Sequence, residues 1–144
     1  MSVFVDTGVF YAHHDEDAPR HEAARTAFDE LLSGEYGPLY TNDYVLDEVV
    51  TLTRKRTGSF AASKTIADRI LGRGAFPTVV DVQYVTRPVV TAALDVYERY
   101  DDHDLSFTDG VVVATCETAG IDRVCSFDDD FGGVVDRLDP AAVG

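Results

Sequence analysis

Four acidic residues, far apart in the sequence, lie where apolar segments end or turn inward: Asp6, Glu48, Asp109 and Asp128. An α/β fold would bring them to one edge of a sheet, where carboxylates repel one another unless a cation lies between them. Mg²⁺ or Mn²⁺ accepts such oxygen ligands, and one or two ions can support an in-line phosphoryl displacement. The pattern therefore indicates metal-dependent phosphate chemistry.

Two hydroxyl side chains accompany these acids. Thr7 follows Asp6, and Ser126 lies two residues before Asp128. Residues that hydrogen-bond to metal-binding carboxylates or to a ligand water orient the site. We expect Thr7 and Ser126 to have this supporting role.

Three of the acids also have an ordinary structural explanation. Asp6 could cap a helix following Gly8, and Asp109 in a first helical turn is favoured by the helix dipole. Asp128 could belong to a solvated acidic turn that continues to position 130. Glu48 is harder to explain in this way, because its own helix is expected to turn it inward.

The helix that carries Glu48 is expected to begin after Asn42, a typical N-cap residue. At about 100° per residue, Glu48 shares one face with three apolar residues, and two aspartates point to water. A buried acid is costly unless a charge or a metal meets it. The apolar residues are Val45, Val49 and Leu52, and the aspartates are Asp43 and Asp47.

The whole chain alternates predicted strands and helices. The strands are expected over residues 3–5, 39–41, 78–82 and 123–125, with an edge strand at 134–135. Two helices are expected over residues 18–32 and 58–72. Three others are expected to begin after Asn42, at Thr86 and at Thr108, with Thr108 as an N-cap. Residues 6–8 are expected to leave the first strand as a loop. Such alternation predicts a three-layer α/β/α fold with a mostly parallel central sheet, in one domain covering residues 1–144.

Composition favours a cytoplasmic protein. No run approaches the ~18 apolar residues of a membrane span, and the N-terminus does not resemble a signal peptide. Cys116 and Cys125 form neither a metal spacing nor a disulfide framework. The net charge of −14, with lysine only at Lys55 and Lys64, resembles the composition of haloarchaeal and other halophilic proteins.

Positive charge is concentrated in one stretch. Only Asp68 opposes the basic residues between positions 54 and 73. We expect Arg54, Lys55, Arg56 and Lys64 to follow the phosphate backbone of a nucleic acid, with Tyr44 or Phe60 available to stack a base. The alternative is that these side chains offset the helix dipole and increase solubility. The six basic residues are Arg54, Lys55, Arg56, Lys64, Arg69 and Arg73.

Four segments resemble, in order, the motifs of PIN-domain ribonucleases, in particular the VapC-type toxins of toxin–antitoxin pairs. They are Val-Phe-Val-Asp-Thr at 3–7, Leu-Asp-Glu-Val at 46–49, Asp-Leu-Ser-Phe-Thr-Asp at 104–109 and Ser-Phe-Asp-Asp-Asp-Phe at 126–131. The resemblance covers nearly the whole chain. One departure is Gly8, where many members carry Asn or Ser.

This resemblance implies a metal-binding quartet of Asp6, Glu48, Asp109 and Asp128, with Asp104 or Asp130 as auxiliary acids. It implies cleavage of single-stranded RNA with Mg²⁺ or Mn²⁺, leaving a 5′-phosphate and a 3′-hydroxyl. It also implies a homodimer and a cognate antitoxin that enters the active groove. Both Asp128 and Asp130 could reach the metal.

Two other enzyme classes in which a strand ends in an acid fit this sequence less well. Haloacid-dehalogenase-like phosphatases need a second acid two residues after the first, and that position is Gly8. A receiver domain needs paired acids before Asp6 and a late lysine, and both are missing. A nuclease of RNA maturation or quality control, or a non-catalytic PIN-like interaction module, remains as an alternative.

Overall fold

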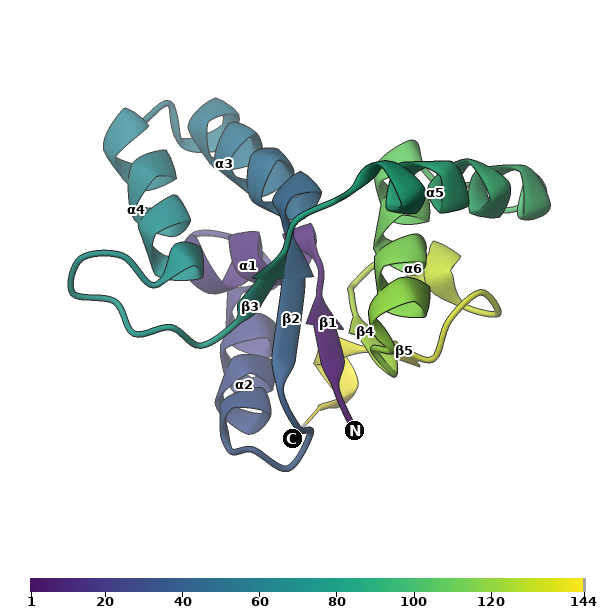
Figure 1. Ribbon diagram of the computed structural model, residues 1–144. Helices are drawn as coiled ribbons and strands as arrows, with labels where there is room; N and C mark the ends of the chain where they lie inside the picture. The colour runs from purple at the N-terminus through teal and green to yellow at the C-terminus, as the bar shows by residue number, and fades with distance from the viewer. Residues whose placement is uncertain (144) are drawn as a thin grey trace.

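The computed structural model describes residues 1–143. Its centre is a five-stranded sheet with the strand order β3-β2-β1-β4-β5, and the neighbouring strands pair in parallel. The carboxyl ends of the strands therefore meet at one edge (Figure 1). The strands are β1 (Val3–Val5), β2 (Leu39–Asn42), β3 (Asp81–Gln83), β4 (Arg123–Cys125) and β5 (Arg137–Leu138).

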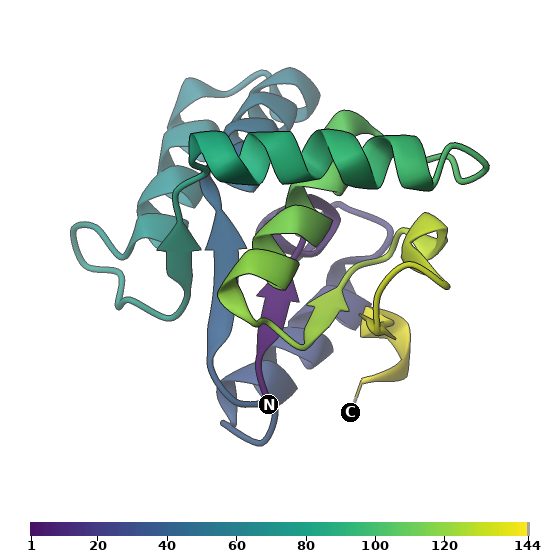
Figure 2. The ribbon, with the colours of Figure 1, turned by 45° about the vertical axis from the view of Figure 1, so that its right-hand side comes forward.

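Helices cover both faces of this sheet. Figure 2 shows α5 and α6 in front of the sheet and α1 and α2 behind it, which confirms the predicted α/β/α arrangement. Helices α3 and α4 pack against each other as a hairpin (Figure 1). No helix within residues 1–143 combines the length and the apolar character needed to cross a membrane. The helices are α1 (Thr7–His14), α2 (His21–Leu32), α3 (Asp43–Thr57), α4 (Phe60–Leu71), α5 (Arg87–Arg99) and α6 (Phe107–Ala119), with short 3₁₀ turns η1 (Asp129–Phe131) and η2 (Pro140–Ala142).

The core lies where β1 and α6 meet. All three residues of β1 are fully buried, as expected for a central strand covered on both faces. Residues 110–116 of α6 are also buried, as the apolar run from Val111 to Ala114 requires. Asp6 directly follows β1 and Asp109 lies in the first turn of α6, so two of the candidate ligands adjoin this buried core.

Caps and polar contacts fix the start of α3 beside the sheet edge. The Asn42 side chain accepts a 2.8 Å hydrogen bond from the Val45 amide, and its own amide nitrogen donates to Thr115 Oγ1 at 3.1 Å. Gly58 ends α3 with a positive φ of 67°, a conformation that favours glycine. The predicted N-cap at Asn42 is therefore confirmed, and it ties α3 to α6.

Two expectations near the N-terminus were wrong. Helix α1 begins at Thr7, so Thr7 and Gly8 are helical instead of forming a loop, because the run from Val9 to Ala12 is buried against the sheet. Helix α2 begins at His21 instead of Ala18, since the Asp15 carboxylate accepts from the Asp17 amide in a turn before it. The turn places Arg20 immediately before α2.

Three smaller expectations also differ from the structure. The third strand runs from Asp81 to Gln83, later than 78–82, because it pairs with Tyr40 to Asn42 of β2. The last strand lies at 137–138, and Val135 makes only an isolated bridge with Gly132. Helix α6 is capped by Ser106 and not by Thr108, which lies inside the first turn.

Candidate active site

The four predicted acids line one cleft of about 450 Å³ at the carboxyl ends of β1 and β4. Asp129 is a fifth acid in its wall. Asp6 follows β1, Asp128 lies beyond β4, Asp109 begins α6 and Glu48 projects from α3. The topology thus brings four distant chain segments to one place, as predicted for the edge of a parallel sheet.

Asp6 is the deepest of these acids, with 7% of its surface exposed. It is the N-cap residue of α1, but its side chain makes no capping hydrogen bond, so the structural explanation of Asp6 as a helix cap was wrong. Burial raises the pKa of Asp6 to about 6, and the negative charges of Asp109 and Glu48 raise it further against the hydrogen bond from Ser126. Asp6 is therefore a desolvated carboxylate that lacks a neutralising partner among the described residues.

Ser126 links Asp6 to the segment that carries Asp128. Its hydroxyl donates to Asp6 Oδ2 at 2.7 Å and accepts from the Asp128 amide at 3.0 Å. The Thr7 hydroxyl is buried in the same cleft and has no hydrogen-bond partner within residues 1–143. A buried hydroxyl is normally satisfied, so this one indicates a missing polar ligand in the cleft.

Asp109 combines a structural contact with its place in the cleft. Its Oδ2 accepts from the Ser106 amide at 3.0 Å, and its amide donates to Ser106 Oγ at 3.1 Å, which together form a capping box. Burial raises the pKa of Asp109, and the nearby charges of Asp128 and Glu48 add to the shift. The fixed Oδ2 contact orients the carboxylate.

Glu48 differs from its predicted setting. It is exposed at the rim of the cleft and is not enclosed in an apolar face, because the buried face of α3 is formed by Val45, Val49 and Thr53. Asp43 was also expected to point to water, but its Oδ1 accepts from the Val85 amide at 2.8 Å. Glu48 is therefore the most exposed of the four acids.

Only part of the acidic turn after β4 faces the cleft. Asp128 and Asp129 line it, whereas Asp130 and Asp104 do not. Asp128 Oδ1 accepts from the Asp130 amide at 2.9 Å, so Asp128 also caps η1. Asp104 contributes a negative charge close to Asp130 at the edge of this turn.

The four predicted acids share a cleft but do not form one tight cluster of ligand oxygens. Within residues 1–143, the only three acids with ligand oxygens all within 4.8 Å of one another are Asp128, Asp129 and Asp130, and not three of the predicted quartet. Mg²⁺ keeps several waters and uses one or two protein carboxylates, so widely spaced acids can act through those waters. The unpartnered Thr7 hydroxyl and the unneutralised Asp6 fit the same kind of ligand.

Arg20 was missed in the sequence. It lines the acidic cleft, and its Cζ lies 4.9 Å from the ring centroid of Phe127. No spacing marks this residue, since a turn brings it to the site.

Gly8 lines the same wall, and a Cβ there would be 3.9 Å from Phe127, so a larger residue has room at this position.

The predicted basic patch is divided in the structure. Lys55 lies with Tyr44 in a hollow that shares Glu48 with the acidic cleft. Lys64, on α4, pairs with Asp68 at 2.7 Å and does not line the cleft.

The two arginines expected to contact RNA, Arg54 and Arg56, are stacked on rings. Arg56 stacks on Tyr11 at 4.9 Å, and Arg54 stacks on Phe60 at 5.6 Å. The four basic side chains therefore have separate partners on α1, α3 and α4 and do not form one continuous basic surface.

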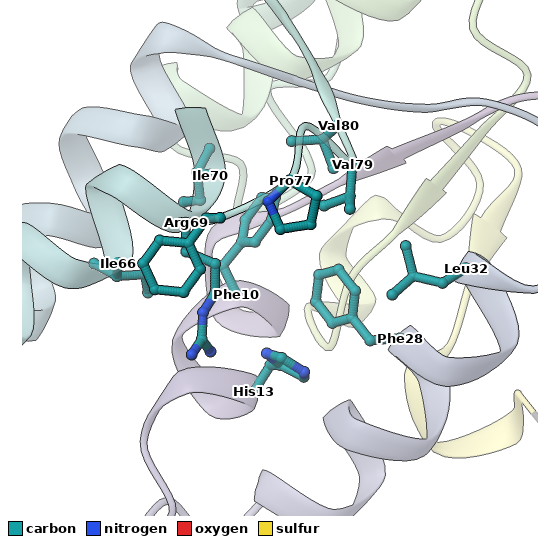
Figure 3. Close-up of a pocket in the computed structure, with 11 residues that line it drawn as sticks. Phe10, His13, Phe28, Leu32, Ile66, Arg69, Ile70, Pro77, Val79 and Val80 are labelled. Atoms are coloured by element: carbon teal, nitrogen blue, oxygen red, sulfur yellow. The ribbon is translucent and has the colours of Figure 1, made fainter. Parts of the chain in front are cut away.

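A separate apolar pocket of about 250 Å³ lies among α1, α2, α4 and the segment before β3 (Figure 3). Phe10, Phe28 and Ile70 line it, and its polar side chains are His13 and Arg69. Burial lowers the pKa of His13, with the positive charge of Arg69 adding to the effect. This pocket shares no residue with the acidic cleft and contains no carboxylate, so it does not carry the hydrolytic chemistry.

Comparison with known families and sequences gives a consistent result. The PIN domain family matches residues 3–136. The 23S rRNA-specific endonuclease VapC20 of Mycobacterium tuberculosis is 31% identical over 129 residues, covering 90% of this chain and 91% of that protein. A VapC ribonuclease of Archaeoglobus fulgidus is 24% identical over 132 residues, covering 91% of this chain and 80% of that protein.

Solved structures agree with these sequence matches. The crystal structure of M. tuberculosis VapC20, described as a toxin that cleaves the sarcin–ricin loop, has a TM-score of 0.78 at 28% identity and covers 92% of this chain and 94% of that chain. VapBC2 from Rickettsia felis, solved with a promoter DNA fragment, has a TM-score of 0.70 at 8% identity and covers 96% and 98%. The latter is a likeness of fold alone.

Proposed function

This chain belongs to the PIN-domain family, as its motifs predicted, and from its cleft we propose that it is a metal-dependent endoribonuclease. The observation that carries the proposal is the convergence of Asp6, Glu48, Asp109 and Asp128 on one cleft. The match over residues 3–136 supports a single PIN domain over 1–144. The reaction is hydrolysis: a water oxygen bonds to phosphorus, the bond to the 3′ oxygen breaks, and a 5′-phosphate and a 3′-hydroxyl remain.

The residues of the cleft are proposed to have different roles according to how deeply they lie. Mg²⁺ or Mn²⁺, when bound, supplies a polarised water and positive charge for the phosphoryl oxygens. Asp6, Asp109 and Asp128 would hold the ion directly or through its waters, and Glu48 would do so from the rim. Ser126 and Thr7 would fix the carboxylate of Asp6 and a ligand water, as hydroxyl groups around metal ligands do.

A cleavage assay with matched variants tests the activity. Wild-type protein with Mn²⁺ or Mg²⁺ is expected to cut RNA, to stop cutting in EDTA, and to leave 5′-phosphate ends. Asp6→Asn and Glu48→Gln keep side-chain size and remove charge, and both are expected to be inactive. Equal cleavage by wild type and both variants would identify a contaminating nuclease and reject the proposal. Since VapC20 is named as specific for 23S rRNA, ribosomal RNA is the first substrate to test.

We also propose that the protein is the toxin of a toxin–antitoxin pair and acts in the cytoplasm. The support is its similarity to VapC-type chains over nearly its full length. Induced expression in a host should arrest growth, and Asp6→Asn should relieve the arrest. A cognate antitoxin should copurify when the neighbouring reading frame is coexpressed, and sedimentation should give a homodimer. Growth unaffected by active protein would favour a role in RNA maturation or quality control.

Contacts with the RNA backbone are proposed for Arg54, Lys55, Arg56 and Lys64. Their support is unequal: Lys55 adjoins Glu48, whereas Lys64 is engaged by Asp68. Charge reversal at Arg54 and Arg56 together should weaken RNA binding and leave metal binding unchanged. Unchanged RNA affinity in that double variant would remove the two arginines from the contact set.

A further inference from the structure

A second groove of about 450 Å³ opens beside the acidic cleft. The two hollows share Gly8, Arg20, Leu52 and Phe127, so the groove continues the cleft instead of forming a separate site. Its remaining wall includes Tyr11 of α1 and Arg56 at the end of α3. A molecule that occupies the acidic cleft can therefore extend directly between two arginines.

Each of these arginines is supported by an aromatic ring. The Cζ atoms of Arg20 and Arg56 lie 4.9 Å from the ring centroids of Phe127 and Tyr11, respectively. The Tyr11 ring is itself fixed, since only 6% of the residue is exposed and its hydroxyl donates to Asp15. Stacking on a ring holds a guanidinium plane in place, so less side-chain freedom is lost when it binds a ligand.

Both charges remain available for a ligand. Within residues 1–143, neither Arg20 nor Arg56 has a carboxylate oxygen within 4.0 Å, although the chain carries a net charge of −14, and both residues are exposed. Many other basic side chains of this protein are paired. These are Arg25, Lys64, Arg73, Arg99, Arg123 and Arg137.

The chemistry of the groove matches a phosphodiester. Guanidinium groups bind phosphate oxygens through paired N–H donors, more strongly than they bind neutral acceptors. An RNA strand with one phosphate at the acidic cleft necessarily carries its next phosphate one nucleotide away along the strand.

We propose that Arg20 and Arg56 form a subsite that binds the phosphodiester adjoining the scissile one in single-stranded RNA. The inference rests on the proposed function, which places the scissile phosphate at the acids. Phe127 and Tyr11 act as positioning residues, because they hold the guanidinium planes and do not contact the phosphate. Arg20 borders both hollows and therefore lies at the junction between scissile and adjoining nucleotides.

Binding is best measured where RNA stays intact. The parent protein carries Asp6→Asn, and the probe is a short fluorescein-labelled single-stranded RNA whose anisotropy is followed at several KCl concentrations with Mn²⁺. Arg20→Gln and Arg56→Gln are each expected to raise Kd about tenfold, as for a lost hydrogen bond to a charged group. Each should also make the plot of the logarithm of the association constant against log salt less steep by about 0.7, the value for one phosphate contact with a single strand.

Arg99→Gln is the matched control, because Arg99 also stacks on a ring, that of Tyr100 at 5.8 Å, but lines neither hollow. Its Kd and salt slope should equal those of the parent. Phe127→Leu should weaken binding less than Arg20→Gln while keeping the salt slope, since the charge remains. Circular dichroism of every variant verifies that the fold is retained.

The outcomes separate the two proposals. A double variant Arg20→Gln, Arg56→Gln that binds with the parent's Kd and slope overturns the subsite, and so does an equal loss in Arg99→Gln. Cleavage by the protein with Asp6 intact is measured in parallel. Wild-type protein that cuts RNA while the double variant keeps its KM rejects the subsite alone, whereas weakened binding without any cleavage by wild type rejects the nuclease alone.

Discussion

The Ser126 hydroxyl donates a 2.7 Å hydrogen bond to Asp6 Oδ2, joining the end of β4 to the end of β1. The same hydroxyl accepts from the Asp128 amide, so one side chain sets the distance between two candidate ligands. The hydrogen bond to the charged carboxylate lowers the pKa of Asp6 against the larger effect of burial. Ser126 thereby favours the ionised form of Asp6.

Removing this hydroxyl should move the pH dependence of activity. In Ser126→Ala the pKa of Asp6 rises above its present value of about 6, because burial is no longer opposed by the donor. The acidic limb of the rate profile should therefore shift to higher pH, with part of the activity recovered in alkaline buffer. Cleavage rates measured from pH 5 to pH 9 check this shift.

Ser63→Ala is the matched control for this substitution. Ser63 is also buried, and its hydroxyl donates to the Phe60 carbonyl, away from the cleft. Its loss should reduce stability by about 1 kcal/mol and leave the pH profile where it is. A Ser126→Ala profile that coincides with that of Ser63→Ala would show that the hydroxyl does not tune Asp6.

Asp6→Asn is expected to stabilise the metal-free protein while abolishing cleavage. The folded pKa of Asp6, about 6, is above its ordinary value of 3.8, so the folded state holds a proton that the unfolded chain has released between these values. This contribution to stability is complete below pH 4 and is lost as the pH rises through 6. A difference of about two pKa units corresponds to about 3 kcal/mol.

Thermal unfolding in EDTA measures this effect. At pH 7.5 the Tm of Asp6→Asn should exceed that of wild type, and at pH 4 the two should converge. Added Mn²⁺ should raise the Tm of wild type more than that of Asp6→Asn, because a bound cation compensates the buried charge of Asp6 only in wild type. A variant less stable than wild type at pH 7.5 in EDTA would contradict the role of desolvation at Asp6.

Ser106 and Asp109 allow capping to be separated from chemistry. Ser106→Ala removes the acceptor for the Asp109 amide and should reduce stability by about 1 kcal/mol, with cleavage largely kept. Asp109→Asn keeps an oxygen to accept from the Ser106 amide and removes the charge, so the fold should persist and cleavage should be lost. Urea unfolding and rate measurements on both variants test the division. Similar losses of rate in the two would show that Asp109 acts only as a cap.

Much of the fold follows from local patterns that act over a few residues. The fully apolar β1 and the all-round apolar α6 predict central, doubly covered elements, and the structure confirms them. Asn42 predicts the start of α3 because a cap needs only its own three following residues. The loop expected at residues 6–8 hid the true start of helix α1 at Thr7, because so short an apolar run does not show where a helix begins without the sheet that buries it.

The candidate site was predictable to the extent that topology decides it. Residues after parallel strands share an edge, so Asp6 and Asp128 were expected together, and they line one cleft. The exposure of Glu48 was not predictable, since helical periodicity gives a direction but not what covers it. Arg20 reaches the cleft through a turn, and its partner Phe127 comes from the other end of the chain.

Salt is expected to stabilise this protein, because it has a net charge of −14 and its acidic side chains repel one another in the folded state. Raising KCl from 0.1 M to 1 M shortens the screening length from about 10 Å to about 3 Å, so repulsion between surface acids falls. The Tm should rise over this range. A variant with Glu16→Gln, Glu35→Gln and Asp101→Asn, three exposed acids outside the cleft, should need less salt for the same Tm. If wild type and variant respond alike, surface repulsion is not what salt relieves.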